Sequence, residues 1–437
     1  MQTSFRPEQL EDPQIAEAEK ILRKCVHCGF CTATCPTYVT LGNELDSPRG
    51  RIYLIKDMLE NDRPADDEVA LHVDRCLSCL ACTTTCPSGV DYMHLIDHAR
   101  THVEQTWKRP FLDRMIRAAL VRILPYPGRF RSALMLARLG KPFRSFFARS
   151  KATRPLSAML ALAPQHLPKR RLSAPTDSGG IKTDRKSRVA ILRGCAQSVL
   201  DPGINIAATA LLERFGVEVI AAAGESCCGS LVHHMGRREL ALHQARLNID
   251  AWTRELEQKG LDAVIITTSG CGTTIKDYGH MLQHDPAYAQ KAAKISSLAC
   301  DVTEYLSKLD LPDQSPKKLA VTYHSACSMQ HGQKITEIPK RLLRLAGFTV
   351  AEPLESHLCC GSAGTYNILQ PDIAEMLKQR KISNLDATKP DVIVAGNIGC
   401  ITQIASAMKT PVVHTVELLN WAYGGEQPEK LKDYLLA

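Results

Sequence analysis

Two cysteine-rich runs near the beginning of the chain constrain its fold more than any other feature. The first reads Cys25-Val-His-Cys28-Gly-Phe-Cys31-Thr-Ala-Thr-Cys35-Pro36, and the second reads Cys76-Leu-Ser-Cys79-Leu-Ala-Cys82-Thr-Thr-Thr-Cys86-Pro87. Both have the spacing C-x2-C-x2-C-x3-C-P. Residues three apart on a tight loop bring three thiolates to one small centre, whereas the extra residue and the proline turn the fourth sulfur away. The runs therefore predict two metal centres within one folding unit whose folding is coupled to metal binding.

The spacing is that of two-cluster bacterial ferredoxins, in which the fourth cysteine of each run ligates the cluster of the other run. We assign one [4Fe-4S] cluster to Cys25, Cys28, Cys31 and Cys86. We assign the other to Cys76, Cys79, Cys82 and Cys35. Zinc is the alternative metal for a thiolate-rich site. It usually takes two separated C-x2-C pairs into one tetrahedron, which two tandem four-cysteine runs fit poorly.

Length and composition indicate a globular protein of two to three domains. The chain has 437 residues, of which 44% are hydrophobic and 23% charged. It has no uninterrupted apolar run long enough to cross a membrane, so no transmembrane helix is expected. Its 17 cysteines are clustered at ligand spacing, and its first residues lack the apolar core of a secretory signal. These features predict a cytoplasmic location in the reducing cytosol.

The net charge of +8 is concentrated in one segment. Between Trp107 and Arg171 there are sixteen Lys and Arg residues and a single acid, Asp113, which gives this segment a charge of +15. Its arginines interleave with apolar residues, and prolines divide it into short amphipathic helices. Such helices lie on anionic membrane surfaces or dock on an acidic partner subunit, and the alternative is a linker packed on its own protein. We expect no nucleic-acid partner, because no recognisable reading motif accompanies the charge.

The pattern along the chain predicts an α+β multidomain protein. Its four parts are an α-helical ferredoxin module at 10–106, a basic amphipathic helical linker at 107–188, and two α/β modules at 189–310 and 319–425. In the first part, Asp12-Pro13 and Ser47-Pro48 each place a capping residue before a proline, which is typical of a helix start. Residues 173–186 are polar and contain glycine, which predicts a flexible connector at the end of the linker.

The two α/β modules are an internal repeat. Their strand and helix patterns recur in the same order, and their cysteines recur at nearly constant distance. The pairs Cys195 and Cys327, Cys227 and Cys359, and Cys228 and Cys360 are each 132 residues apart, and Cys271 and Cys400 are 129 apart. Cysteines at strand ends fit a ligand site at the carboxyl edges of parallel sheets.

Each module carries a Cys-Cys-Gly-Ser element. Successive side chains alternate on a regular strand, so adjacent cysteines reach one centre only through an irregular turn, which the glycine permits. We expect a helix directly after it, whose N-terminus favours thiolates. A third cluster is assigned to Cys195, Cys227, Cys228 and Cys271, and a fourth to Cys327, Cys359, Cys360 and Cys400. The alternatives are a scaffold without metal and a redox dithiol.

The remaining residues near these elements have plainer interpretations. Cys300 has no counterpart in the other copy, and we expect a buried core thiol. His233, His234, His324 and His331 lie close to the cysteines in the sequence. A histidine can replace a thiolate as a cluster ligand or hydrogen-bond a quinone. A structural role, or a hydrogen bond to a ligand, is the more common use, and we expect it here.

The two modules resemble the cysteine-rich CCG domain of heterodisulfide reductase, and the chain from Asp12 to Trp421 resembles the iron–sulfur subunits of glycolate oxidase. The features that carry the resemblance are the paired ferredoxin runs, Ser47-Pro-Arg-Gly-Arg51, both Cys-Cys-Gly-Ser elements and Asn397-Ile-Gly-Cys400. The heterodisulfide reductase pattern ends in C-x-x-C. Here Thr268 and Asn397 replace the first cysteine of that pair, which leaves four thiolates in each copy. Four suffice for an ordinary cluster, but the departure puts the larger noncubane cluster in doubt.

The sequence contains neither a G-x-G-x-x-G turn after a strand nor a P-loop, so we expect no flavin or nicotinamide site in this chain. The resemblance implies an electron-transfer subunit. A partner subunit containing FAD would oxidise glycolate or D-lactate, and the electrons would pass to a quinone at the cytoplasmic face of the inner membrane. The alternatives are a subunit of a lactate-utilisation or glycerol-3-phosphate dehydrogenase complex, a thiol–disulfide reductase, and a zinc-containing assembly subunit.

Overall fold

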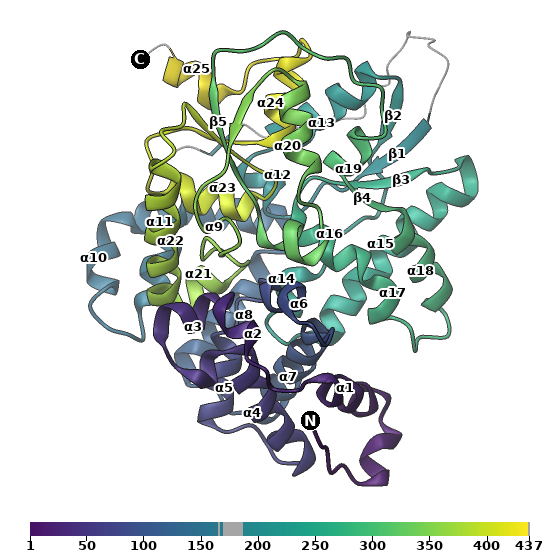
Figure 1. Cartoon of the computed structure of the whole chain (residues 1–437), viewed down its shortest axis with the longest axis vertical. Helices are drawn as coiled ribbons and strands as arrows, with labels where there is room; N and C mark the ends of the chain where they lie inside the picture. The colour runs from purple at the N-terminus through teal and green to yellow at the C-terminus, as the bar shows by residue number, and fades with distance from the viewer. Residues whose placement is uncertain (165–166, 169–186, 436–437) are drawn as a thin grey trace.

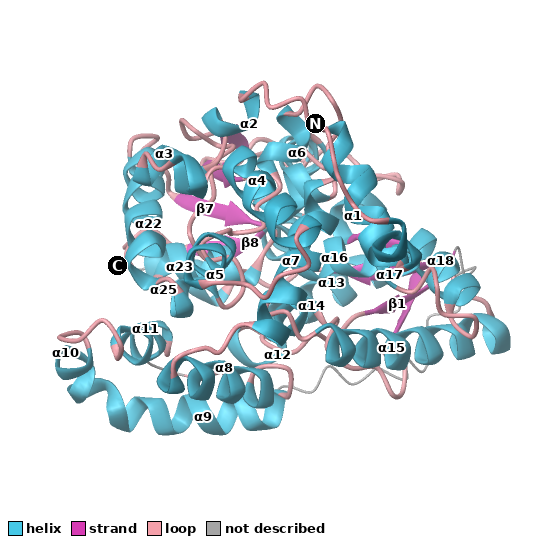
Figure 2. Cartoon of the chain, turned by 90° about the horizontal axis from the view of Figure 1, so that it is seen from below, coloured by secondary structure: helices cyan, strands magenta, loops and turns pink. Residues whose placement is uncertain are grey.

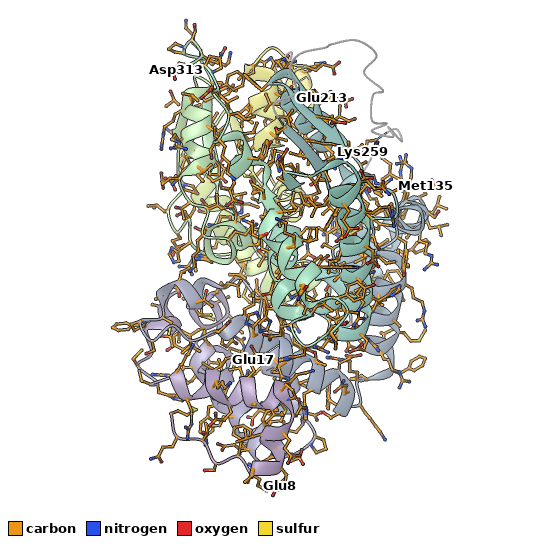
Figure 3. The ribbon with its side chains drawn as sticks, turned by 90° about the vertical axis from the view of Figure 1, so that its right-hand side faces the viewer. Glu8, Glu17, Met135, Glu213, Lys259 and Asp313 are labelled. Carbon is orange, nitrogen blue, oxygen red and sulfur yellow. The ribbon has the colours of Figure 1, made fainter. Side chains whose placement is uncertain are left out.

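The computed structural model describes residues 1–164, 167–168 and 187–435. Figure 1 shows a helical N-terminal region at one end of the molecule and two α/β units side by side at the other. The polar connector predicted at 173–186 lies outside the described residues. In the view of Figure 3, Glu8 and Glu17 mark the N-terminal region, whereas Glu213, Lys259 and Asp313 belong to the α/β part. The α+β architecture predicted from the sequence is confirmed.

The N-terminal region is built from short helices around the cysteine loops. They are α1 (Pro13–Lys24), α2 (Phe30–Ala33), α3 (Pro36–Leu41), α4 (Pro48–Glu60), α5 (Asp67–Asp74), α6 (Ala81–Thr85) and α7 (Tyr92–Thr106), with 3-10 turns η1 (Pro7–Glu11) and η2 (Glu44–Asp46). Both predicted helix starts are confirmed, because the Asp12 carboxylate accepts from Gln14 N–H and the Ser47 hydroxyl accepts from Gly50 N–H. The apolar faces of α1, α4, α5 and α7 meet in one core.

The basic segment forms a layer of helices along one side of the α/β units, as Figure 2 shows. Its elements are α8 (Phe111–Ile123), α9 (Pro127–Gly140), η3 (Lys141–Phe143), α10 (Arg144–Phe147) and α11 (Arg154–Leu162). The predicted division into short helices is confirmed. Among the described residues, no helix combines the length and the apolar character that a membrane crossing requires. Strand β1 begins at Ser187, two residues before the predicted start of the first α/β module.

The two α/β units have the same topology, which confirms the internal repeat. The strands are β1 (Ser187–Ile191), β2 (Val217–Ile220), β3 (Ala263–Ile266) and β4 (Ala299–Asp301), then β5 (Ala320–His324), β6 (Thr349–Ala351), β7 (Val392–Ala395) and β8 (Val412–His414). All pairs are parallel, and the orders are β2-β1-β3-β4 and β6-β5-β7-β8. One hydrophobic core contains strand residues from both sheets, among them Val189 and Val321, so the two units fold against each other.

Helices cover the faces of both sheets (Figure 1). In the first unit they are α12 (Gln197–Leu200), α13 (Gly203–Arg214), α14 (Ser230–His233), α15 (Arg238–Lys259), α16 (Ser269–Lys276), α17 (Tyr278–Met281), α18 (Ala289–Leu298) and α19 (Val302–Leu306). In the second they are a π-helical turn η4 (Ser328–Gly332), α20 (Ile338–Leu345), α21 (Tyr366–Leu369), α22 (Pro371–Asp386), α23 (Ile398–Ala405), α24 (Thr415–Ala422) and α25 (Glu429–Leu435). Cys300 lies buried in β4, which confirms the predicted core thiol.

Candidate iron–sulfur and cysteine-rich sites

The structure brings each predicted set of ferredoxin cysteines to one cavity. A small cavity between α2, α4 and α6 is lined by all four cysteines of the first set, Cys25, Cys28, Cys31 and Cys86. A second is lined by Cys35 together with Cys76, Cys79 and Cys82. In both cavities the fourth cysteine comes from the other run, which is the arrangement that crossed ligation requires.

Local backbone geometry explains how the runs deliver their sulfurs. Gly29 and Leu80 precede α2 and α6 in the left-handed conformation, with φ of 84° and 62°, and turn the chain between the second and third cysteines of each run. Cys35 ends the first run in extended backbone, and Pro36 then begins α3. Because proline fixes the start of α3, the Cys35 sulfur leaves its own run and faces the second.

The protonation of these thiols fits a metal site. Burial raises the pKa of Cys79 and of Cys82 well above the usual thiol value, so both are protonated at neutral pH when no cation is present. Thiolates in such a place need a compensating positive charge. Four sulfurs in one cavity, with no disulfide among them, supply the donor set of an iron–sulfur cluster.

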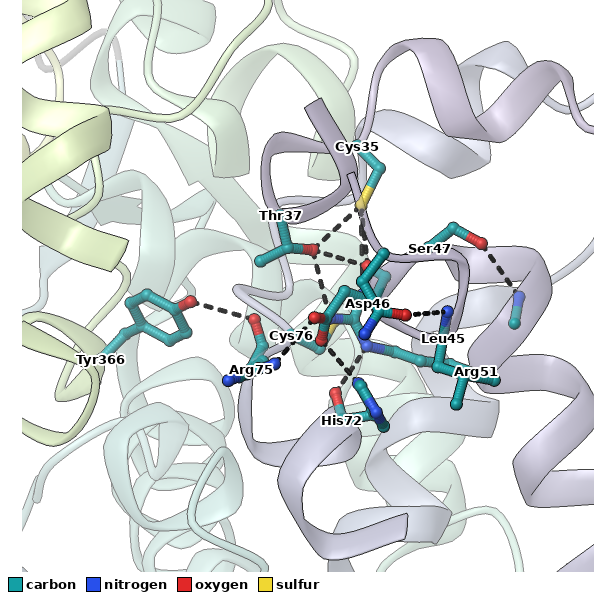
Figure 4. A network of polar contacts seen from close by, with 12 residues as sticks. Cys35, Thr37, Leu45, Asp46, Ser47, Arg51, His72, Arg75, Cys76 and Tyr366 are labelled. Carbon is teal, nitrogen blue, oxygen red and sulfur yellow. Dashed lines mark hydrogen bonds and ion pairs between the residues drawn. The ribbon is translucent and has the colours of Figure 1, made fainter. Parts of the chain in front are cut away.

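A buried polar network surrounds Cys35 (Figure 4). The Arg51 guanidinium, 1% exposed, donates to the Cys35 sulfur at 3.9 Å and to Thr37 Oγ1 at 3.1 Å. The buried Asp46 carboxylate pairs with Arg51 at 3.5 Å, His72 at 2.8 Å and Arg75 at 2.9 Å. Arg51 thus places a fixed positive charge beside the second ferredoxin cavity. It belongs to the Ser-Pro-Arg-Gly-Arg stretch that carries part of the family resemblance.

Sequence reasoning missed the function of Arg51, although the sequence held a signal for it. Arg51 lies four and seven residues before Ile55 and Met58, on the apolar side of α4. A charged side chain on the buried face of an amphipathic helix requires a partner. Gly50, its neighbour, has no room for a side chain, because a Cβ there would lie 2.1 Å from the Glu44 carbonyl oxygen.

In the first α/β unit, the four cysteines lie after the carboxyl ends of three parallel strands. Cys195 follows β1, Cys227 and Cys228 follow β2, and Cys271 lies in the first turn of α16 after β3. The sulfurs of Cys227 and Cys195 are 3.4 Å apart. The second unit repeats this placement with Cys327, Cys359, Cys360 and Cys400. The strand edges therefore bring together each predicted set.

The glycine of each Cys-Cys-Gly-Ser element allows the tight turn. Gly229 and Gly361 have φ of 88° and 84°, and a Cβ would lie 3.1 Å from Ala241 O and 2.5 Å from Ala374 O respectively. The expected helix follows directly in the first copy, where α14 begins at Ser230. In the second copy the expectation is wrong, because a turn at 363–365 precedes α21, which begins only at Tyr366. Gly364, with φ of 66°, adds a second bend there.

In the second cysteine set, the pKa of Cys360 shifts in the opposite direction from those of Cys359 and Cys400. Hydrogen bonds from the Cys359 and Cys400 thiols lower the pKa of Cys360, and the neighbouring His324 lowers it further. The Cys360 side chain is fully buried.

Thr268 and Asn397, which stand where the heterodisulfide reductase pattern has a cysteine, use their side chains for hydrogen bonds within the protein. Thr268 donates its hydroxyl to the Gln197 side chain. The Asn397 side chain caps its own helix, accepting from Gly399 N–H at 3.1 Å.

Three of the four flagged histidines have structural partners. His233 Nε2 lies 3.1 Å from Asp97, and the His234 ring lies near the same carboxylate and near Arg100. His331 contacts the Thr84 hydroxyl at 2.8 Å and the His357 carbonyl at 3.1 Å. His324 differs, because it is fully buried and neither ring nitrogen has a hydrogen-bond partner.

A cavity of about 340 Å³ joins the cysteine sets. Cys79 of the ferredoxin module lines it, as do Cys195, Cys228, Cys271, Cys327, Cys359 and Cys400 of the α/β units. Its apolar wall comes from α8, α9 and α11, including Leu120, Leu134 and Met159. Gln197, Ser230 and His234 supply polar groups at the wall formed by the first unit. Buried thiols, an apolar wall and a few polar groups are typical of a small-molecule site.

Comparison with known families agrees with this geometry. Residues 21–90 match the family of 4Fe-4S dicluster domains, and residues 189–276 and 321–405 each match the family of cysteine-rich (CCG) domains. The chain is therefore an iron–sulfur protein in which a dicluster ferredoxin module is followed by two cysteine-rich copies.

Comparison with full-length relatives identifies the family within this class of iron–sulfur proteins. The chain is 44% identical over 430 residues to the glycolate oxidase iron-sulfur subunit of Escherichia coli, which covers 97% of this chain and 99% of the relative. It is 27% identical over 241 residues to lactate utilization protein A of Oceanobacillus iheyensis, covering 53% of this chain and 96% of that protein. A solved hypothetical protein from Helicobacter pylori shares the fold, with a TM-score of 0.54 at 12% identity over 96% of this chain and 74% of that one. The chain belongs to the family of glycolate oxidase iron–sulfur subunits.

Proposed function

We propose that this chain is the electron-transfer subunit of a complex that oxidises glycolate or a related 2-hydroxy acid. The observation that supports it most strongly is the meeting of three cysteine sets at one cavity, since Cys79 of the second ferredoxin set lines the same space as Cys228 and Cys359. The first ferredoxin set lies next to the second, since Cys82 lines both ferredoxin cavities, and no cysteine of the first set lines the larger cavity. The sets thus form a row through the protein.

Iron–sulfur clusters held by these cysteines would supply one-electron carriers. The protein's own residues bury the sites and set the charge around them, with Arg51 beside Cys35 and Tyr92, whose hydroxyl donates to the Cys76 sulfur at 3.8 Å. In this proposal the two-electron oxidation of the acid takes place on a partner subunit containing FAD. In this proposal electrons enter on the side of the exposed Cys28, which belongs to the first set.

The cavity is the exit in this proposal, and its acceptor is a quinone. An apolar wall from α8, α9 and α11 suits a hydrophobic molecule, and polar side chains at the other wall suit a quinone head group. The outer side of the same helices carries exposed apolar residues within a basic segment, which fits the cytoplasmic surface of an anionic membrane.

D-Lactate is the second candidate substrate. The similarity to lactate utilization protein A favours it, although that match covers only about half of this chain. Because substrate oxidation belongs to the partner in this proposal, the choice between the two acids depends on that subunit and not on this chain.

The assignment of acid oxidation to the partner and of electron transfer to this chain is tested by purifying the chain with and without its flavin-containing partner, under anaerobic conditions. We expect glycolate to reduce the clusters, and so to produce their EPR signals, only when the partner is present. Cys79→Ser should stop electron delivery to an external quinone. Cys300→Ala is the matched control, because this buried thiol belongs to none of the sets. Full glycolate dehydrogenase activity in the chain alone contradicts the proposal.

A further inference from the structure

The two cysteine-rich copies differ at the residue that lies three positions before their first cysteine. His324 is the last residue of β5 and lies three residues before Cys327. With the 132-residue offset that relates Cys195 to Cys327, the matching residue of the first copy is Leu192. Leu192 is buried in an apolar cluster with Cys195 and Cys228. A fold that accepts leucine at this place does not need an imidazole there for packing.

The His324 ring is a buried polar group whose nearest ligand-type neighbours are the sulfurs of Cys360 and Cys400. It is fully buried, and neither Nδ1 nor Nε2 makes a hydrogen bond within the described residues. An imidazole carries a donor and an acceptor that water would satisfy in the unfolded chain, so leaving both nitrogens unpaired in the interior destabilises the fold. Native proteins rarely keep such a group unless an ion or ligand satisfies it.

The surroundings of the ring identify the missing partner. A ring nitrogen of His324 and the sulfurs of Cys360 and Cys400 all lie within 4.8 Å of one another, and all three residues are buried. Imidazole and thiolate together form a donor set that binds iron and zinc.

Asn397 is the other residue to consider as a fifth donor in the second copy. Asn397 occupies the place of the cysteine that heterodisulfide reductase has, and its amide is engaged in capping α23. His324 approaches the same sulfurs from the end of β5.

We propose that His324 is a ligand of the metal centre in the second cysteine-rich copy, so that the two copies hold chemically different centres. The first copy has thiolates alone, whereas the second combines thiolates with an imidazole. The inference rests on the proposed function in one respect, namely that the second copy holds a metal. A neutral imidazole adds less negative charge than a thiolate, and histidine ligation raises the potential of iron–sulfur centres. The second copy is then the more oxidising of the two.

Pulsed EPR on the whole chain, purified anaerobically from cells fed nitrogen-15 histidine and reduced with dithionite, tests this assignment. We expect strong nitrogen-15 coupling to one centre, of the size that direct bonding gives. His324→Leu, which installs the residue of the first copy, should remove this coupling and the metal of one centre. His324→Cys should keep the metal, remove the coupling and lower the potential of that centre. His331→Leu is the matched control, since His331 has its own partners and its loss should leave the coupling intact.

Two results overturn the assignment. One is a His324→Leu protein with the same iron and zinc content as the wild type and an unchanged spectrum. The other is a wild-type protein whose metal is accounted for by the two ferredoxin clusters alone. The second result leaves the ferredoxin module competent for electron transfer. It is therefore distinguishable from failure of the proposed function, because the reduction of the clusters by glycolate is measured without reference to His324.

Discussion

At the scale of single residues, the charge of Arg51 governs the second ferredoxin site. Its guanidinium is almost wholly buried between Cys35 and Asp46. A positive charge in a low-dielectric environment favours the reduced, more negative state of a nearby redox centre. The Asp46 carboxylate offsets part of this charge, but Asp46 also pairs with His72 and Arg75.

Arg51→Met should lower the reduction potential of the cluster held by Cys35. We expect a change of about 60 mV, which corresponds to a tenfold shift for a one-electron couple. It should also destabilise the module by about 3–5 kcal/mol, because the buried Asp46 loses a partner. EPR-monitored redox titration measures the potential.

Lys56→Met on the same helix serves as the control, since Lys56 pairs with Glu60 and does not contact a cysteine. Arg51→Lys retains the charge and should retain most of the potential. An Arg51→Met protein with an unchanged potential would show that the guanidinium has only a structural role.

Residue patterns predicted the cysteine sets, the helix caps and the internal repeat, because each depends on local spacing. They did not predict β4 or β8, the strands that end the two sheet orders β2-β1-β3-β4 and β6-β5-β7-β8. They also gave His324 the same interpretation as His233 and His331. Its difference is visible only once β5, the Cys-Cys-Gly-Ser turn and α23 bring it to Cys360 and Cys400.

At the scale of elements, the helices of the basic segment have two different faces. Leu120 and Leu134 face the interior, whereas Leu136 and Leu139 on α9 are 68% and 75% exposed. Figure 3 shows Met135, also exposed, pointing outward from the side of the molecule. Phe111, Phe143 and Phe146 extend the exposed apolar surface along neighbouring helices. Apolar side chains among arginines are typical of helices that lie on an anionic lipid surface.

Replacing Leu136 and Leu139 together by Asp should weaken binding to vesicles that contain anionic lipid. We expect at least about a tenfold loss, because burying one leucine contributes about 1.5–3 kcal/mol and the new charges are repelled. Co-sedimentation with vesicles measures the binding. Leu354→Asp is the control, since Leu354 is equally exposed but lies in the turn after β6. Equal losses in both proteins would contradict a specific membrane face.

At the scale of the whole molecule, ion pairs join the ferredoxin module to the first cysteine-rich copy. His94 on α7 lies 2.7 Å from Asp91 and 2.9 Å from Asp277 at the end of α16. Its ring stacks on His280 at 3.5 Å, and His280 lies 2.5 Å from Glu17. Burial disfavours the charged ring, but hydrogen bonds to Asp277 and Asp91 raise the pKa of His94 to about 10. These contacts hold two cysteine-bearing units in fixed relation.

The pKa of His94 makes this junction sensitive to alkaline pH. The pKa of His94 is about 10 in the folded state and about 6.5 in the unfolded state. The stabilisation that protonated His94 gives to the folded state is therefore complete below pH 6.5 and is lost as the pH rises towards 10. The free energy of unfolding should fall by at least about 1 kcal/mol more in the wild type than in His94→Gln over this range. Denaturant titrations at several pH values measure it, and parallel curves for the two proteins would exclude the effect.

The row of cysteine sets from the ferredoxin module to the cavity is the central feature of the molecule. Its most direct test is the iron and acid-labile sulfide content of the anaerobically purified chain, combined with EPR. The account predicts iron clearly above the roughly eight atoms that two [4Fe-4S] clusters hold, with additional signals that disappear in Cys228→Ser and in Cys360→Ser. Iron near eight, with spectra unchanged in both variants, would contradict it, because the row would then end at the ferredoxin module.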